Sequence, residues 1–290
     1  MERSHQAING KTVEVLYCRS APEDKGHVIA SSQVCPYCGR LNAAQVLRCS
    51  GCERRLPTSW ELALARFRAR ALAGAPATVF FAALSVAVYV ALVASAGRLG
   101  APVSGRAALR WGALVGELGW REPWRHLSAM FVHFGLLHVG FNVLALVSFG
   151  RALERVLGTA RFTLLLLLSG ALGFLASDVW YAWFPPEQVT GGLSGGIFGL
   201  LGAEVGLRFA AGEAGWKRSA VSALGYAVAM ALMPGQTVNN AAHVGGLLSG
   251  AVLGWALSRA ASRTLDRALA GAALLLALVT LGAIAQAHSG

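Results

Sequence analysis

The sequence predicts an all-α polytopic membrane protein that carries a small cysteine-containing module at its N-terminus. Of its 290 residues, 55% are hydrophobic and only 13% are charged, whereas soluble domains are near one quarter charged. The mean hydropathy is +0.54. Seven apolar segments follow residue 70, each near the ~20 residues that a helix needs to cross a hydrocarbon core of ~30 Å. A helical bundle in a bilayer is the fold class that these observations indicate.

The loops between the predicted helices alternate in charge. The predicted spans are residues 71–97, 129–149, 162–184, 193–211, 219–234, 241–258 and 266–287. Arginine and lysine favour cytoplasmic loops; they occur after the second, fourth and sixth spans and are absent after the third and fifth. The exception is the long loop after the first span, whose tryptophans alternate with Arg106, Arg110, Arg121 and Arg125. We interpret this loop as a segment lying in the outer interface, where its side chains reach lipid head groups.

The net charge of +11 does not indicate a nucleic-acid partner, because the arginines lie between apolar segments. There they meet the lipid bilayer at anionic head groups and fix the orientation of the chain. The first 70 residues contain no apolar run that would form a cleavable signal peptide. We therefore expect a multi-pass protein of the bacterial cell (inner) membrane, with its N-terminus cytoplasmic and its C-terminus outside. The sequence carries no signal of an oligomeric state.

Strongly polar side chains are few within the predicted spans and gather at one depth. Because such groups are costly in a bilayer, each is a candidate functional residue. The second span carries His133, His138 and Asn142, the fourth begins with Ser194, and the sixth begins with His243. These three spans all run from outside to inside. All five side chains are therefore expected in the outer half of the membrane, at a site that opens to the outer side.

Ser194 differs from other serines of the spans in its glycine-rich surroundings. Ser85, Ser169 and Ser249 are expected to donate to carbonyls of their own helices. Two stripes of small residues have the i, i+4, i+8 spacing that lets helices touch: Gly195, Gly199 and Ala203, and Gly246, Gly250 and Gly254. If the stripes face each other, the Ser194 hydroxyl and the His243 imidazole meet at hydrogen-bond distance. Such a contact is what activates a weak hydroxyl nucleophile.

His138 and Asn142 lie four residues apart and so share one face of a helix. Two interpretations of this pair stay open. The side chains form hydrogen bonds between helices, or they donate to the oxyanion that arises when Ser194 attacks a carbonyl. For His133, near the start of the same span, we expect a structural role in which it bonds the backbone of the long loop.

The polar residues belong to a set of motifs that resembles the rhomboid family of intramembrane proteases over about residues 75–258. The motifs, in chain order, are Trp124 and Arg125; His133, His138 and Asn142; Glu154; Gly192, Ser194 and Gly195; and Ala242, His243, Gly246 and Gly250. Phe198 departs from the commonest family pattern, since a tyrosine often stacks on the histidine from this position. We expect the stacking to persist without a hydroxyl contact.

The resemblance implies a serine endopeptidase that cleaves peptide bonds in or near transmembrane segments of protein substrates. It implies a catalytic dyad of Ser194 and His243 without an acidic third member, and an oxyanion site from His138, Asn142 and the Ser194 backbone N–H. No cofactor takes part in this chemistry. The implied six-helix core covers residues 71–258, and residues 259–290 form a seventh helix found in some members. The fifth span and the loop of residues 234–240 are expected to move to admit a substrate.

Two other functions are alternatives to a protease. A metal or ion carrier would use His133, His138 and His243 as ligands, but transporters place such sites at a midplane between repeats. A non-catalytic rhomboid-like scaffold would bind membrane helices. Members of that kind lack the serine or the histidine, and both are present here.

Two C-x-x-C pairs mark a separate module within a cytoplasmic region of residues 1–70. The pairs, with ten residues between them, are Cys35 and Cys38, and Cys49 and Cys52. Four thiolates at this spacing suit tetrahedral Zn2+ and predict a structural zinc-ribbon-like module over about residues 33–56. A rubredoxin-like iron site is the alternative, although its pairs are normally much further apart. A module of this size needs the metal to fold, and Cys18 is expected to be a free thiol.

Overall fold

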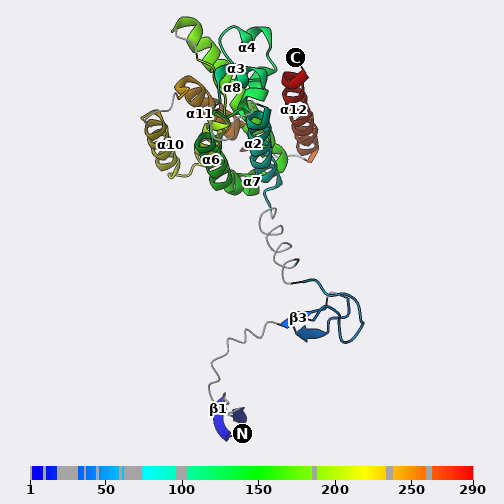
Figure 1. Ribbon diagram of the computed structural model, residues 1–290. Coiled ribbons are helices and arrows are strands. Elements are labelled where there is room, and N and C mark those ends of the chain that lie inside the picture. The colour runs from blue at the N-terminus through cyan, green and yellow to red at the C-terminus, as the bar shows by residue number, and fades with distance from the viewer. Residues whose placement is uncertain are drawn as a thin grey trace. The chain divides into compact units, whose positions relative to one another are not determined.

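The computed structural model describes residues 2–8, 11–17, 32–35, 37–43, 46–58, 61, 74–95, 103–184, 188–232, 238–258 and 263–289. The chain forms two compact units, Met1–Phe67 and Arg68–Gly290. The described strands lie in the first unit and all the described long helices lie in the second (Figure 1). Cys18 and residues 234–237 of the predicted mobile loop lie outside the described residues.

The described residues of the N-terminal unit include two antiparallel hairpins. In the first, β1 (Glu2–Ile8) pairs with β2 (Lys11–Tyr17). In the second, β3 (Ser32–Val34) pairs with β4 (Leu41–Ala43), and the first cysteine pair lies between these strands. The β1–β2 hairpin was not predicted. Its sequence signal is the Asn-Gly dipeptide at positions 9 and 10, which favours a two-residue connection between strands.

The second unit is a helical bundle, which confirms the predicted fold class (Figure 1). Its long helices are α2 (Pro76–Ser95), α8 (Thr159–Trp183), α9 (Ser194–Ala210), α10 (Trp216–Ala231), α11 (Asn240–Ser258) and α12 (Arg263–Ser289). Between α2 and α8 the chain forms α3 (Gly105–Arg110), α4 (Leu118–Arg121), α5 (Arg125–Ser128), the 3-10 turn η1 (Ala129–Phe131), α6 (Leu136–Ala145), the π-helix η2 (Leu146–Gly150) and α7 (Arg151–Leu157). Five segments of the described chain are long and apolar enough to cross a membrane.

The predicted start of the second span is wrong. The prediction was a helix over residues 129–149, whereas the continuous helix of α6, η2 and α7 begins at Leu136 and ends at Leu157. Gly135 has extended backbone angles and precedes the first helical turn. The apolar residues before it form η1 and a bend, so hydropathy alone could not separate them from the helix. His133 consequently lies before α6 and not within a span.

Glycine allows α9 and α11 to pack backbone against backbone. Every residue of α9 from Gly195 to Ala203 is buried. A Cβ at three positions of α11 would collide with a carbonyl oxygen of α9; the pairs are Gly246 with Gly195, Gly250 with Gly199, and Gly254 with Ala203. The two predicted stripes therefore face each other, as expected. This contact brings the first turns of both helices together.

Glu154 joins α7 to the start of α2. Its side chain is only 1% exposed, and it accepts hydrogen bonds from the backbone N–H groups of Ala77 and Thr78 at 2.9 and 2.8 Å. The hydroxyls of Thr78 and Thr159 also donate to it, at 2.8 and 3.0 Å. The first N–H groups of a helix lack partners within the helix, and a negative charge is favourable at that end. Glu154 therefore holds α2, α7 and α8 together.

The replacement Gly250→Ala is expected to destabilise the bundle by about 1–3 kcal/mol, because the added methyl group meets backbone that cannot move aside. The unfolding midpoint in detergent, followed by circular dichroism, measures this effect. Gly282→Ala in α12 is the matched control, since nothing lies within 4 Å of a Cβ there and alanine favours a helix over glycine by up to ~1 kcal/mol. Equal midpoints for the two variants would contradict a backbone contact at Gly250.

Candidate active site

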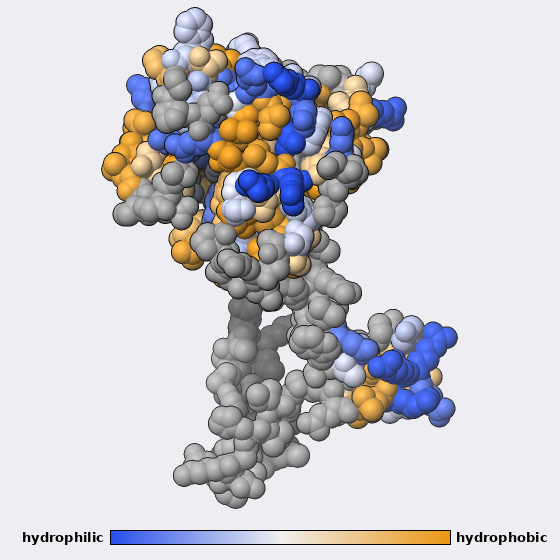
Figure 2. Space-filling view, turned by 45° about the horizontal axis from the view of Figure 1, so that its top comes forward, coloured by the Kyte–Doolittle hydropathy of each residue, from blue (hydrophilic) through white to orange (hydrophobic). Residues whose placement is uncertain are grey.

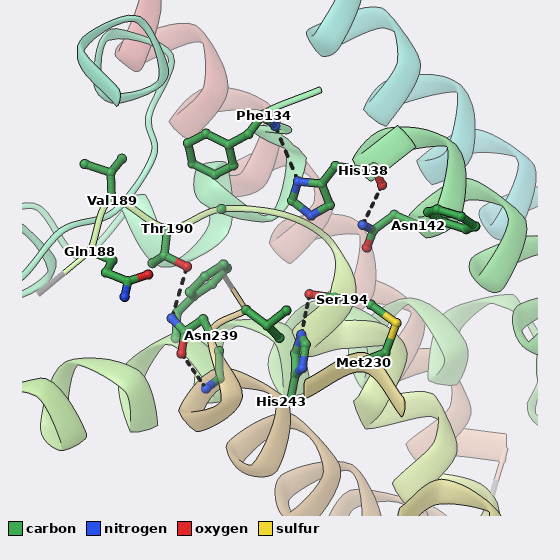
Figure 3. Close-up of a pocket in the computed structure, with 16 residues that line it drawn as sticks. Phe134, His138, Asn142, Gln188, Val189, Thr190, Ser194, Met230, Asn239 and His243 are labelled. Carbon is green, nitrogen blue, oxygen red and sulfur yellow. Dashed lines mark hydrogen bonds between the residues drawn. The ribbon is translucent and has the colours of Figure 1, made fainter. Parts of the chain in front are cut away.

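Ser194 and His243 meet where α9 and α11 begin (Figure 3). The Ser194 Oγ and the His243 Nε2 are 2.8 Å apart. The three serines expected to bond their own helices do so: Ser85, Ser169 and Ser249 donate to carbonyls at 2.9, 2.6 and 2.7 Å. Ser194 therefore differs from them in that its hydroxyl faces an imidazole.

Aromatic packing orients the His243 ring. The ring lies parallel to that of Phe198, with the centroids 4.3 Å apart and an angle of 24° between the planes. His243 Nδ1 is buried and has no hydrogen-bond partner among the described residues. Phe198 in turn contacts Tyr226 of α10, with the ring centroids 5.4 Å apart. The stacking expected of Phe198 is present, and it fixes the plane of the imidazole where other sites use a hydrogen bond.

His138 and Asn142 line the same cavity of ≈ 130 Å³ as Ser194 and His243 (Figure 3). The backbone N–H of Phe134 points at His138 Nδ1 from 3.4 Å. With Nδ1 as acceptor, the proton of the neutral ring is assigned to Nε2. The Asn142 amide donates to the His138 carbonyl at 2.8 Å, which leaves its second N–H available. Both side chains can therefore offer N–H groups to an anion in this cavity.

Gly192 allows the chain to pass close to His138. A Cβ at this position would lie 2.7 Å from His138 Nε2, and its φ of +119° is unfavourable for other residues. The Gly192 N–H donates to the Ala129 carbonyl at 2.8 Å, and Thr190 exchanges two backbone hydrogen bonds with Leu114, at 2.9 and 2.7 Å. The segment that leads to the serine is thus held against the loop before α6.

Asn239 connects three parts of the site and was not singled out from the sequence. Its side-chain oxygen accepts from the Ala242 N–H at 3.0 Å, which caps the first turn of α11. Its amide nitrogen donates to the hydroxyls of Ser177 in α8 and Thr190, at 2.7 and 3.0 Å. One amide therefore fixes the start of the histidine-bearing helix to the segment that precedes Ser194.

His133 and Arg125 stabilise the loop around the site. His133 is fully buried, and its Nδ1 donates to the Phe131 carbonyl at 3.0 Å. Arg125 donates to the carbonyls of Leu109 and Ala113 at 2.8 and 2.9 Å, and its guanidinium lies 4.6 Å from the centre of the Trp124 ring. Both residues thus bond loop backbone, and the His133 ring also packs edge-on against the ring of His138, with the centroids 5.0 Å apart.

A second buried pair, His126 and Asp178, joins this loop to α8. His126 Nε2 lies 2.8 Å from a carboxylate oxygen of Asp178. Burial is the largest single influence on His126 and lowers its pKa. The hydrogen bond to Asp178, the hydrogen bond to the Pro123 carbonyl and the charge of Asp178 together outweigh burial, so the pKa of His126 is raised. Asp178 lies in a predicted span, where any ionisable residue is a candidate. That rule identifies Asp178 from the sequence alone. Its partner His126 lies in a loop outside the predicted spans, where the rule does not apply.

Four cysteine thiols gather in the N-terminal unit. The Sγ atoms of Cys35, Cys38, Cys49 and Cys52 all lie within 4.8 Å of one another. Cys35 and Cys52 are 3.6 Å apart and Cys38 and Cys49 are 3.5 Å apart, close to the roughly 3.8 Å between sulfurs that share a tetrahedral zinc. Hydrogen bonds from backbone N–H groups of residues 51 and 52 lower the pKa of Cys49 to about 6. These residues fit a tetrahedral metal ion.

The two C-x-x-C turns have the same backbone pattern. The N–H groups of Gly39 and Glu53 donate to the carbonyls of Cys35 and Cys49, each at 2.9 Å. Both donors have positive φ, of 74° and 58°. Each turn therefore presents its two thiols from a similar loop.

The fold and the site define a polytopic helical membrane protein with a partly buried serine–histidine pair. Residues 120–260 match the Rhomboid domain family, and α12 lies beyond them. The chain belongs to the rhomboid family, which confirms the resemblance seen in its motifs.

Three relatives illustrate this similarity. The chain is 30% identical to Rhomboid protease GluP of Bacillus subtilis (strain 168) over 69% of its own length and 38% of that protein. It is 36% identical to RHOMBOID-like protein 2 of Arabidopsis thaliana over 52% of this chain and 46% of that one. It is 31% identical to Rhomboid-type serine protease 2 of Emericella nidulans, over 50% and 29%. The chain thus spans less than half the length of each of these relatives.

The replacement Asn239→Ala is expected to slow the labelling of Ser194 by a fluorophosphonate by roughly 10- to 100-fold, since misplacing reacting groups by about 1 Å has effects of this size. A second variant, Ser177→Ala with Thr190→Val, removes the acceptors of the amide and leaves the α11 cap intact. Labelling rates across pH, with unfolding midpoints, separate misplacement from unfolding. A wild-type rate in the second variant would contradict a positioning role for the two hydroxyl contacts.

Proposed function

We propose that the protein is a rhomboid-type serine endopeptidase that cleaves peptide bonds in or near transmembrane segments of membrane proteins. The observation that carries this proposal is the 2.8 Å contact between Ser194 Oγ and His243 Nε2 inside a bundle of membrane-length helices. The names of the relatives, two of which are proteases, support the same chemistry. A hydroxyl paired with an imidazole beside free N–H donors is the minimum set for acyl transfer.

The reaction uses the groups around the cavity in order. His243 Nε2 takes the proton of Ser194 as Oγ attacks the substrate carbonyl. The oxyanion then accepts hydrogen bonds from the Ser194 backbone N–H, His138 Nε2 and Asn142. His243 passes the proton to the leaving amine, and water hydrolyses the acyl-enzyme by the reverse sequence of proton transfers. Stacking on Phe198 keeps the imidazole in place during both halves of the reaction.

The proposed substrate is a membrane helix that approaches past α10. In α10, Ala223 is the only buried residue. In α9, more than half of the residues are buried. A helix that buries so little apolar surface can move aside at lower cost than its neighbours. We place the protein in the bacterial inner membrane with the N-terminal unit cytoplasmic and the cavity opening outside, because the loop charges follow that orientation.

The replacement Ser194→Ala is expected to abolish both cleavage of transmembrane substrates and labelling by a fluorophosphonate. The full-length protein in liposomes provides both measurements. Ser169→Ala is the matched control, because that hydroxyl bonds its own helix and its loss should leave labelling intact.

Two outcomes would contradict the proposal. Cleavage that persists in Ser194→Ala would assign the chemistry to another residue. A wild-type protein that is well folded and neither labelled nor active would instead be a non-catalytic scaffold or a carrier.

We propose further that Cys35, Cys38, Cys49 and Cys52 hold one structural Zn2+, since their sulfur positions and shared turn pattern suit tetrahedral coordination. Metal analysis of the purified full-length protein is expected to give about one zinc per chain. Cys49→Ser should remove most of it, while Cys18→Ser, the control, should not. Iron at the same stoichiometry, or equal zinc in both variants, would contradict this assignment.

A further inference from the structure

Four arginines line a hollow at the end of the bundle where α12 finishes. The cavity of ≈ 830 Å³ is bordered by Arg106, Arg110, Arg121 and Arg125, by Glu122 and Trp124 and, from α12, by Gln286. Figure 2 brings this end of the unit forward and shows hydrophilic side chains grouped beside apolar surface. The cavity shares no lining residue with the one at Ser194. It is therefore a separate site.

The positive charge of this cavity is only partly balanced. Arg121 pairs with Glu117 at 2.9 Å and Arg125 pairs with Glu122 at 2.8 Å. Arg106 and Arg110 are exposed and have no ion pair within the described part of the chain. They lie four residues apart on α3 and so share one face of it. Two guanidinium groups are thus presented to whatever occupies the cavity.

The surroundings of the cavity match the level of lipid head groups. The apolar segment of α12 is a candidate membrane span in which only 17% of the residues are buried, so most of its surface faces lipid. The cavity lies at the C-terminal end of that helix, beside Trp124. Trp120 is 57% exposed nearby, and tryptophans with such exposure are typical of the boundary between acyl chains and head groups. Anionic head groups at this level attract cations such as the arginines of the cavity.

We propose that this cavity binds the phosphate of an anionic phospholipid, with Arg106 and Arg110 as its principal ligands. A guanidinium can donate two parallel hydrogen bonds to a phosphate, and two such groups exceed the charge of one phosphodiester. A lipid is favoured over an acidic peptide because the cavity adjoins the lipid-facing surface of α12 and not the Ser194 cavity. Bound lipid would link α3 and α5 to the C-terminal helix α12.

The test compares lipid binding by the full-length protein and two double variants. Phosphatidylglycerol or phosphatidylcholine is titrated into the protein in neutral detergent, and unfolding midpoints and lipids retained in native mass spectra are recorded. Phosphatidylglycerol is expected to raise the midpoint of the wild type and to be retained preferentially. In Arg106→Gln with Arg110→Gln its apparent affinity should fall by roughly tenfold or more. Lys217→Gln with Arg218→Gln, which removes the same charge elsewhere, should respond as the wild type does.

Several outcomes would overturn the proposal. An equal response of the three proteins to phosphatidylglycerol would show that total charge, and not this cavity, selects the lipid. Inorganic phosphate that matches phosphatidylglycerol in effect would indicate a site for free anions. Binding of an acidic peptide without any retained phosphatidylglycerol would indicate a protein partner. If the arginine variant unfolds, the wild-type mass spectrum decides, since equal retention of both lipids contradicts the proposal by itself.

Discussion

The structure of the site depends on the backbone contact between α9 and α11. Glycine at positions 199 and 250 lets the two helices approach until a methyl group would no longer fit. Only at that separation do a serine hydroxyl and a histidine ring, both short side chains, reach 2.8 Å. Because lipid is as apolar as the helix surfaces, close packing of this kind and not the hydrophobic effect holds membrane helices together. The same contact therefore supplies both stability and the geometry of the pair.

Polar side chains complete the bundle by satisfying helix ends. Glu154 accepts the first N–H groups of α2, and Asn239 caps α11. Backbone groups without partners are costly in a bilayer, so each of these residues removes a penalty at the point where a helix begins. Each also reaches a second element, since Glu154 contacts Thr159 and Asn239 contacts Thr190. The depth of the helices is thus fixed by hydrogen bonds, while their separation is fixed by glycine.

The sequence predicts those parts of the site that follow from helical spacing. The contact between the small-residue stripes beside Ser194 and His243 could be predicted, because residues spaced by four lie on one face of a helix. Contacts made by loops follow no such period. The start of α6 and the contacts of Asn239 depend on extended segments that hydropathy cannot separate from helix or from each other. Asp178 is an intermediate case, because its position in a span marks it while the identity of its partner does not follow from spacing.

The bundle combines a closely packed centre with one lightly packed helix, α10, and the two meet at Phe198 beside the imidazole. Phe198 lies on α9 and stacks on His243. The ring of Tyr226 in α10 also contacts Phe198. A displacement of α10 therefore changes the packing around Phe198 before it reaches the histidine. The close contact of α9 and α11 keeps these two helices in place when α10 moves, because Gly199 and Gly250 leave no space for their helices to shift. The pair can keep its distance while the neighbouring helix moves, which is the property that a site approached from within the membrane requires.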